Sequence, residues 1–574
     1  IRGPASALYG PDALAGVINI ITRRAEGDIE APFRLTPRLR ALDYNSVNNL
    51  YGSRVELEGL GNKLDMLLGV NTRSADNYQS PQGEIPNSDF ATRSADLRLG
   101  YTPVPGQRLE LSAKFAEVEA GRAGGISGAP GAPFIERRED PLRERFIKLH
   151  YSGNNAESNW QKLEASLYAR DLFTDIDITS RAIPNRLSEV KNIIGGPLVI
   201  GGKLLGVRPW GNSLLTVGTD FFHQMGTGTQ TAVRTTNFNP DGSITNTSAR
   251  SLRQTAPDNS QTDVGLFANN DWDPSERWTV SLSGRLDYIH STTDTQPLPD
   301  ESLRAAYTRG TETTETPLTG GLGVIYRPWQ TLHFTGNVSK AFRAPTTTES
   351  FGASRQGSGF LVPNPQLESE QGVTYELGTR LRLANLKANL TAFYSDYSNL
   401  IVNRPLMFLG LPSTQRVNGG AANIHGLEFA ANWQFARRWE AFMNAAYLHG
   451  TDSDADQSLA YIPPLNGLLG LRYNGINGFF IEGVGKWSLH KGRIDPAQER
   501  ETAGFAVVDM HAGIDLWRVS SRLPAMQLSI GLENIFDKAY RQPTTVEDVR
   551  FARSSTNPLV EPGRAVSITL RSQF

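Results

Sequence analysis

The sequence predicts an all-β protein, a closed transmembrane antiparallel β-barrel of about 22 strands. Three observations support this prediction. Segments of about 9–12 residues alternate apolar and polar side chains, the connections between them are short and long in turn, and no run of about 18 apolar residues exists. Barrel strands alternate lipid-facing and lumen-facing residues, so they need no such run. A chain of 574 residues would otherwise suggest several soluble domains.

The alternation is clearest toward the end of the chain. Apolar and polar side chains take turns over 566–574, and the same holds for 526–533, 508–516 and 386–394. Period 2 gives each strand one apolar and one polar face. A soluble β-sandwich alternates as well, so this pattern alone does not distinguish a sandwich from a barrel.

The polar faces carry many charges, among them Asp509, Glu533 and Arg571. These faces do not suit a dry core, so a sandwich would have to bury the apolar faces of nearly the whole chain against partner sheets. In a barrel, the apolar faces contact lipid and the charged faces contact a wet lumen. The charges therefore favour the barrel.

Short and long connections alternate along the chain, as outer-membrane barrels require of their periplasmic turns and external loops. We predict short turns at 61–63, 103–106, 210–212, 273–276, 327–329, 436–438 and 474–477. We predict long loops at 117–145, 223–262, 290–316, 341–372, 488–504 and 537–562. The count is about 10 short turns and about 11 long loops, hence roughly 22 strands.

Closure of the sheet follows from solvation. Hydrocarbon offers no partner to a backbone N–H or C=O, so only a closed sheet satisfies them all. The final strand ends on Phe574, and a terminal aromatic is typical of outer-membrane barrels.

Composition excludes several classes of function. The formal net charge is −2, which provides no basic surface for nucleic acid. Cysteine is absent, so disulfide frameworks, thiolate zinc sites and cysteine nucleophiles are excluded together.

The first 27 residues differ from the rest. They combine turn-forming residues with a small apolar stretch that ends in a short buried strand near 17–22. The chain starts at Ile1 without Met or a signal peptide, although an outer-membrane barrel must be exported. We therefore expect residues 1–27 to be the end of a domain whose earlier part is missing, and residues 28–574 to be the barrel.

Several motifs, in this order, resemble those of the TonB-dependent outer-membrane receptors. They are Arg2-Gly3-Pro4 with Leu8-Tyr9-Gly10 and Ala15-Gly16-Val17-Ile18-Asn19, then Phe342-Arg343-Ala344-Pro345, Asn364-Pro365-Gln366-Leu367, Gly426-Leu427-Glu428 and Leu532-Glu533-Asn534-Ile535-Phe536. The resemblance implies that residues 1–27 are the C-terminal remnant of the plug domain that fills such barrels. Gly3, Pro4, Tyr9 and Gly10 then belong to the plug motif, and the box that pairs with TonB is absent.

The resemblance also implies a function and partners. We expect active import of a scarce metal chelate across the cell outer membrane, a ferric siderophore first, with haem and then cobalamin as alternatives. The expected partners are the TonB-ExbB-ExbD complex, the chelate, and outer-membrane lipid and lipopolysaccharide, with no nucleic acid and no cofactor. We expect a monomer that is not an enzyme.

In the family that this chain resembles, the arginine of the Arg-Gly-Pro motif pairs with glutamates on the barrel wall. The matching residues are Arg2, Glu376 and Glu428, and the parity of the strands puts both glutamates on the lumen side. Such an arginine would hold the plug in register. The alternative is that both glutamates are solvated lumen charges, since exposed pairs contribute about 0–1 kcal/mol.

Ligand contacts are harder to read. Arg343, Phe351, Arg355 and Phe360 suit an anionic, partly aromatic chelate, although an ordinary polar loop explains them too. Haem receptors of this family often place a histidine between the two central motifs, and residues 346–363 contain none. Four histidines are expected near outer strand ends, where one could bind iron, although solvated loop histidines are more common: His223, His290, His449 and His490.

Two other classes of barrel protein fit the sequence less well. A barrel enzyme needs a nucleophile or paired acids at its outer rim, and Asp509 with His511 comes without a nucleophile motif. A passive porin has about 16–18 strands and no plug, which disagrees with the strand count and the plug motif. A secondary role as an adhesin or phage receptor stays open.

Overall fold

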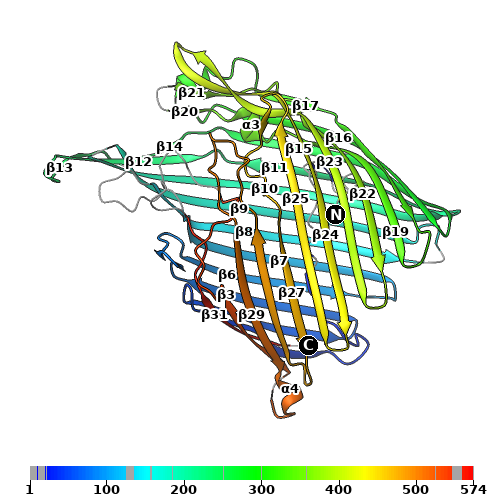
Figure 1. The fold of residues 1–574 in the computed structure, drawn as a ribbon. Coiled ribbons are helices and arrows are strands. Elements are labelled where there is room, and N and C mark those ends of the chain that lie inside the picture. Colours follow the sequence, from blue (N-terminus) through cyan, green and yellow to red (C-terminus); the bar gives the residue numbers. More distant parts are fainter. Residues whose placement is uncertain are drawn as a thin grey trace.

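Strands form where the sequence alternates, and together they close into a barrel of 22 antiparallel strands, as predicted (Figure 1). The structure is a computed structural model. It describes residues 10, 14 and 20 and the ranges 22–123, 135–155, 158–183, 185–249, 251–298, 300–356, 359–523, 525–545 and 559–572.

The wall strands follow one another around the barrel, each antiparallel to the next. The first eleven are β1 (Arg34–Asn45), β2 (Leu50–Gly61), β3 (Leu64–Ala75), β6 (Phe90–Tyr101), β7 (Gln107–Gly121), β8 (Ile135–Asn154), β9 (Lys162–Ile183), β10 (Arg186–Trp210), β11 (Ser213–Gly226), β15 (Asp258–Ser275) and β16 (Trp278–Asp294). The other eleven are β18 (Leu318–Tyr326), β19 (Leu332–Arg343), β22 (Glu370–Arg382), β23 (Leu386–Phe408), β24 (Leu411–Ala436), β25 (Trp439–Asp452), β27 (Asn466–Asn474), β28 (Phe480–Ser488), β29 (Phe505–Asp515), β30 (Met526–Glu533) and β31 (Ala565–Ser572).

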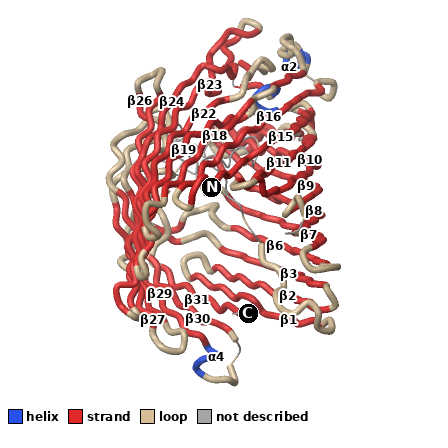
Figure 2. Tube along the Cα trace, turned by 90° about the vertical axis from the view of Figure 1, so that its right-hand side faces the viewer, coloured by secondary structure: helices blue, strands red, loops and turns tan. Residues whose placement is uncertain are grey.

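Closure takes place between the first and last strands. β1 pairs with β31 from Ala41 opposite Arg571 to Asn45 opposite Ser567. The two strands lie side by side in the view of Figure 2. This pairing satisfies the two edges that an open sheet would expose to lipid.

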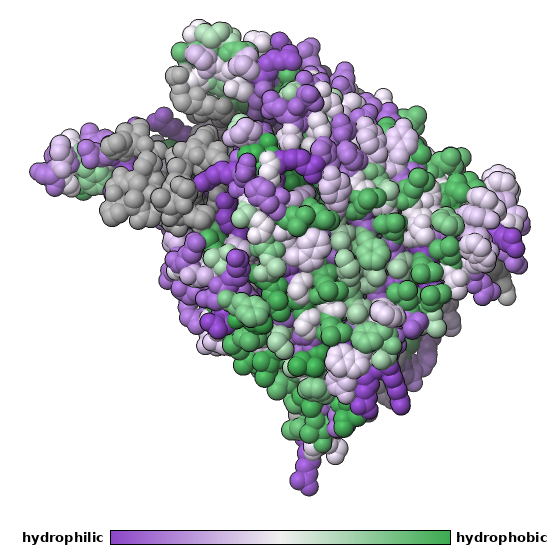
Figure 3. Space-filling view, in the orientation of Figure 1, coloured by the Kyte–Doolittle hydropathy of each residue, from purple (hydrophilic) through white to green (hydrophobic). Residues whose placement is uncertain are grey.

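The two faces of each strand differ as the alternation predicts. On β16, Leu282 and Leu286 are 62% and 49% exposed on the outside, whereas Arg285 and Asp287 between and beside them are buried on the lumen side. Apolar side chains gather over the middle and lower part of the wall, and polar ones over the upper part (Figure 3). The charged faces therefore line the interior, which excludes the sandwich.

Tryptophans mark one end of the barrel. Seven of the nine are exposed beside short connections: Trp210, Trp272, Trp278, Trp329, Trp433, Trp439 and Trp517. Aromatic belts of this kind lie where an apolar surface meets lipid headgroups. The short turns thus lie at the periplasmic interface and the long loops outside.

Small elements decorate the connections. These are β4 (Gln79–Ser80), β5 (Gly83–Glu84), β12 (Gln230–Phe238), β13 (Ile244–Thr247), β14 (Leu252–Gln254), β17 (Glu312–Glu315), β20 (Ser354–Gln356), β21 (Gly359–Val362), β26 (Gln457–Ser458), α2 (Glu301–Arg304), α3 (Thr347–Phe351) and α4 (Leu516–Val519). Among the described residues, no helix has the length and apolarity that a membrane crossing requires.

Two predicted loops turn out to contain strand residues that extend the sheet of the wall. Much of 117–145 belongs to β7 and β8, and part of 223–262 forms β12, which continues the wall by pairing with the first residues of β10. The prediction was wrong there because strands that extend beyond the bilayer need no apolar face. Their side chains meet water on both sides, so the period-2 signal disappears.

Three external connections share an apolar core, which we call the external cap. Its buried residues are Leu298, Leu303, Ala306, Ala353, Phe360 and Val362, with Tyr307, Leu406, Phe408 and Leu411 packed against them. They come from the β16–β18 loop, the β19–β22 loop and the tip of the β23–β24 hairpin. The cap is therefore an ordered part of the fold.

Candidate functional site

A dense cluster of charges lines the lumen where the barrel closes. Arg38 and Arg40 come from β1, and Arg54, Glu56 and Glu58 from β2. Val55, which lies between Arg54 and Glu56 on β2, is 51% exposed on the lipid side, so its two neighbours face the lumen. We call these five residues, together with Asp96 of β6, the wall socket.

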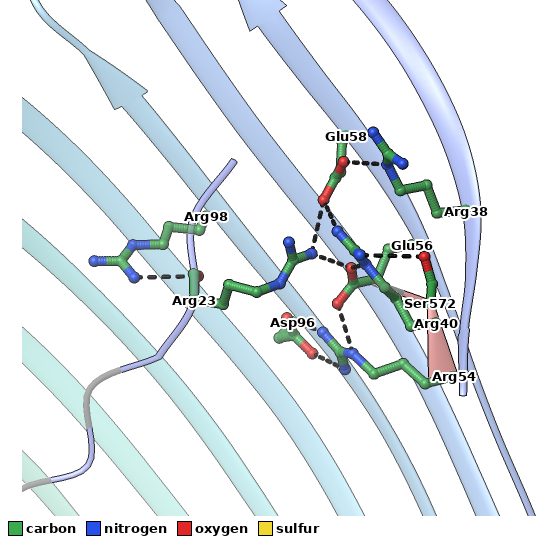
Figure 4. A network of polar contacts seen from close by, with 9 residues as sticks. All are labelled: Arg23, Arg38, Arg40, Arg54, Glu56, Glu58, Asp96, Arg98 and Ser572. Carbon is green, nitrogen blue, oxygen red and sulfur yellow. Dashed lines mark hydrogen bonds and ion pairs between the residues drawn. The ribbon is translucent and has the colours of Figure 1, made fainter. Parts of the chain in front are cut away.

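The wall socket is internally paired (Figure 4). Arg54 donates to Glu56 Oε1 at 2.7 Å and to both oxygens of Asp96. Arg38 donates to Glu58 Oε2 at 2.5 Å. Arg40 donates to both glutamates. Glu56 is only 4% exposed, so these charge-assisted bonds compensate its removal from water.

Arg23 enters this socket from the segment that precedes β1 (Figure 4). Its Nη2 donates to Glu56 Oε2 and, at 2.7 Å, to Glu58 Oε1. Arg98 of β6 holds the same place in the chain, because its Nη1 donates to the carbonyl oxygen of Thr22 at 2.6 Å. The same Arg98 atom also lies 3.2 Å from the Thr22 hydroxyl and 3.2 Å from the Arg23 carbonyl oxygen, so the Arg23 side chain and the bonds from Arg98 together fix residues 22–23 to the wall.

The segment meets the wall again at the periplasmic end. The amides of Asn62 and Lys63, in the β2–β3 turn, donate to the carbonyls of Ala31 at 2.8 Å and Ile29 at 2.6 Å. Gly61 has a positive φ of 127°, and a Cβ there would lie 2.5 Å from the Ala31 oxygen. Glycine thus lets the turn approach the segment closely.

The structure describes the two glutamates of the predicted plug latch but not its arginine. Arg2 lies outside the described residues. Glu376 lies on β22 between Tyr375 and Leu377, which are 50% and 71% exposed outside, so it faces the lumen and accepts a 3.3 Å hydrogen bond from Asn337. Glu428 lies on the lumen side of β24, with β23 between the two strands.

Of the predicted plug motif, Gly3, Pro4 and Tyr9 also lie outside the described residues. Gly10 is described and has a φ of 86°, which favours glycine. A Cβ at Gly10 would lie 3.4 Å from Arg285 Nη2. This part of the chain therefore approaches a lumen-facing arginine of β16.

Arg343 was predicted to contact ligand, and the structure gives it a different set of partners. Its Nε donates to Glu370 at 2.7 Å, and its two Nη atoms donate to Glu349 at 2.8 and 3.1 Å. The side chain thereby ties the end of β19 to α3 and to the start of β22. Its positive charge is compensated within the chain.

Phe351 and Phe360 were predicted as loop aromatics that contact the ligand, and the structure places both side chains inside the packed external loops. They are 0% and 2% exposed. Phe360 packs edge-on against Phe408 with ring centroids 5.5 Å apart, and Tyr307 donates to the Phe351 carbonyl at 2.6 Å. Both rings stabilise the external loops, so neither offers a face to a ligand in this structure.

The side chain of Arg355 lies outside the described residues. Of the four histidines, His223 and His290 contact Thr262 and Thr314 through Nδ1 at 2.8 and 2.9 Å. His449 contacts Arg493, and His490 lies 3.6 Å from Glu501. Within the described part of the chain, no group of three His, Cys, Asp or Glu side chains could hold a metal ion.

Sequence reasoning missed Arg23. A signal was present, since Arg54, Glu56 and Glu58 share one parity on β2 and Arg38 follows on the neighbouring strand. What the sequence did not supply was the register that sets Arg38 opposite Glu56. Without that register, the charged residues of these strands could not be distinguished from ordinary charges that line the lumen.

Comparison with known proteins gives a family match. A family model described as "TonB dependent receptor-like, beta-barrel" matches residues 51–535. The "Iron-regulated outer membrane virulence protein" of Vibrio cholerae is 23% identical over 470 residues, which cover 78% of this chain and 61% of that protein. The chain thus spans about three fifths of that relative's length. The "Hemin receptor" of Yersinia pestis is 21% identical, over 95% of this chain and 76% of the receptor.

Solved structures agree on the fold. The "Copper transporter OprC" superposes with a TM-score of 0.78 at 20% identity and covers all of this chain and 85% of its own. The ferric yersiniabactin uptake receptor FyuA from Yersinia pestis superposes with a TM-score of 0.70 at 16% identity, covering 100% of this chain and 84% of its own.

Proposed function

The chain belongs to the TonB-dependent receptor family of outer-membrane β-barrels, and from this premise we propose that it imports a metal chelate, first of all a ferric siderophore. The observation that carries the proposal is the family match over most of the barrel. The names of its relatives, an iron-regulated outer-membrane protein and a ferric yersiniabactin receptor, support iron as the metal.

Haem is the second candidate, because a hemin receptor aligns with 95% of this chain. Against haem, residues 346–363 contain no histidine. Cobalamin is third and has no specific observation in its favour. A passive porin-like channel is the alternative from another class.

We propose energy coupling through TonB, ExbB and ExbD, because a tightly bound ligand would leave its site too slowly without work. A nanomolar site corresponds to about −12 kcal/mol. With an association rate near ~10⁶ M⁻¹s⁻¹, such a ligand would leave in roughly a thousand seconds. Import at a useful rate therefore requires mechanical work on the plug. We propose that the receptor acts as a monomer, with its apolar band in outer-membrane lipid and its outer rim against lipopolysaccharide.

We also propose that Arg2 bridges Glu376 and Glu428. Their shared lumen face and their separation by one strand support this pairing. In the full-length receptor, Glu376→Gln with Glu428→Gln should loosen the plug, seen as increased entry of a large antibiotic that is normally excluded. Unchanged permeability, with normal amounts of folded receptor, would contradict the latch.

The functional test is uptake by the full-length gene in an iron-starved strain that lacks its own receptors. Ferric siderophores, haem and cobalamin are supplied in turn, with and without TonB. Rescue by one ferric chelate that requires TonB would support the proposal and name the substrate. Rescue by haem alone would favour the second candidate, and uptake that persists without TonB would favour the channel.

A further inference from the structure

We propose that Arg23 is a detachable contact of the segment that leads into β1, and that the carbonyls of Ile29 and Ala31 mark the fixed end where movement of this segment stops. Both contacts connect the same short stretch of chain to the wall. They differ in what remains behind when they break.

The wall socket stays satisfied without Arg23. Glu56 Oε2 keeps the bond from Arg40 Nε at 2.5 Å, and Glu56 Oε1 keeps Arg54. Glu58 keeps Arg38 on Oε2 and Arg40 on Oε1. Each carboxylate oxygen that Arg23 contacts therefore has a second arginine donor. Breaking a buried hydrogen bond is usually costly because an acceptor is left without a donor. That cost does not arise here, since both acceptor oxygens keep one.

Charge balance gives the same result. Without Arg23, the socket sets three arginines against three carboxylates: Arg38, Arg40 and Arg54 against Glu56, Glu58 and Asp96. Docking Arg23 adds one positive charge to a group that is already balanced. Its side chain is also 37% exposed, so water screens the attraction. The contact is specific in geometry but modest in strength.

The contacts at Ile29 and Ala31 are of another kind. They are backbone bonds to the β2–β3 turn, and they lie a few residues before Arg34, where β1 begins and pairs with Leu60. Pulling them away would uncover two turn amides and strain the first pairs of β1. Gly27 also packs so closely that a Cβ there would lie 2.5 Å from Leu60 Cδ2. The segment is therefore fixed from about this point onward.

This division deepens the proposed function, and it rests on that proposal only for the source of the force. A pull on the plug would release residues 22–26 from the socket and from the exposed hydrogen bonds of Arg98 to Thr22 and Arg23, and it would stop at Ile29. The barrel seam beside it would stay closed, since the backbone pairing of β1 with β31 begins only at Ala41, and Arg40 keeps its contacts with β2 and with Ser572 of β31. The socket could then recapture Arg23 when the pull ends.

Single cysteines can test this directly, because residues 1–574 contain none and any cysteine elsewhere in the full-length receptor can be replaced by serine. Ala25 is 7% exposed and lies just beyond Arg23, so Ala25→Cys in the full-length receptor should react slowly with a maleimide. Adding Arg23→Gln should speed this reaction about 5-fold. Arg24→Gln is the matched control: it removes the same charge from the next residue, which is exposed, and should leave the rate unchanged.

Salt separates an ion pair from mere packing. Raising the ionic strength from about 0.05 to about 0.5 M should speed labelling of Ala25→Cys in the parent and have little effect with Arg23→Gln present. Ala31→Cys should react at one rate in all backgrounds. Hydrogen exchange of 22–26 and 29–31 in the cysteine-free chain provides a second readout if a thiol disturbs the segment.

Equal labelling with Arg23→Gln and Arg24→Gln would overturn the detachable contact. A parallel rise at Ala31→Cys would overturn the fixed end. Neither measurement needs TonB or a ligand. A failed uptake experiment would therefore leave these results standing, and a failed labelling experiment would leave the uptake proposal untouched.

Discussion

Arg343 and Arg23 each contact two glutamates, yet they serve opposite purposes. Arg343 joins Glu349 and Glu370 in the external cap, and Arg23 joins Glu56 and Glu58 in the wall socket. Within the described chain, no other arginine or lysine pairs with Glu349 or Glu370, whereas Glu56 and Glu58 each pair with further arginines.

The difference shows that redundancy, rather than the number of contacts, decides whether an ion pair is permanent. Removing a sole partner leaves half-buried carboxylates without a compensating charge, which is costly. Removing a redundant partner leaves them satisfied. On this reasoning Arg343 holds the external cap together permanently, whereas Arg23 can leave the wall socket and bind it again.

The largest expected effect comes from the apolar core of the cap. Phe360→Ala should destabilise the cap by about 3–5 kcal/mol, because it leaves a cavity among Leu298, Val362 and Phe408. Hydrogen exchange of 296–307 and 359–363 should accelerate strongly while the wall strands keep their protection. Phe536→Ala is the control, since that ring is 74% exposed. Similar exchange in both variants would show that the cap does not depend on this core.

The second prediction compares the two arginines. Arg343→Ala should lower the free energy of local opening of the cap by about 2–3 kcal/mol, since it removes charge-assisted bonds from Glu349 and Glu370, which then keep only uncharged donors. Arg23→Ala should cost about 1 kcal/mol or less at the socket. Residue-resolved hydrogen exchange measures both. Equal costs would contradict the role given to redundancy.

The third prediction concerns pH at α3. Burial alone would raise the pKa of Glu349, but the bonds from Arg343 and Thr346 hold it below its ordinary value of 4.5. A lowered pKa stabilises the fold above pH 4.5, and this stabilisation is lost as the pH falls through the lower, folded value. A fluorophore on Thr348→Cys should report the opening of α3 as the pH falls through the folded-state pKa of Glu349. With Arg343→Ala, the same opening should move to higher pH; a fixed midpoint would refute the pairing.

The smallest effect is expected on the strand extensions. Arg145 and Asp171 lie 3.9 Å apart and are 62% and 41% exposed. Arg145→Ala should change stability by no more than about 0.5 kcal/mol, because water screens such pairs. Thermal unfolding followed by the heat-dependent migration of the barrel on a gel provides the measurement. A clear loss would mean that exposed pairs matter more here than the comparison allows.

The sequence was sufficient for the barrel because the bilayer imposes a local rule. Each wall strand must show lipid an apolar face, so alternation, turn spacing and the strand count can be read residue by residue. The charged lumen face at Asp509 and Asp515 follows from the same rule, and both are buried on the inner side.

The external cap and the wall socket could not be predicted in this way. Phe360 meets Leu298 and Phe408 through contacts between separate loops, and no local period encodes such packing. Arg343 looked like an anion site because Glu349 and Glu370, its partners, lie in different elements. Arg23 needed the register of β1 on β2 before its socket was visible.

The long strands also determine what the cell shows to its surroundings. β10 has 25 residues, and only about 9–11 residues of a strand are needed to cross the bilayer. More than half of β10, with β12 paired to it, therefore stands outside as ordered sheet (Figure 1). An immune system would meet a shaped surface there, in place of a loose peptide. Antibodies raised against whole cells should accordingly bind this region in the folded receptor and should no longer bind it after the receptor has been unfolded by boiling.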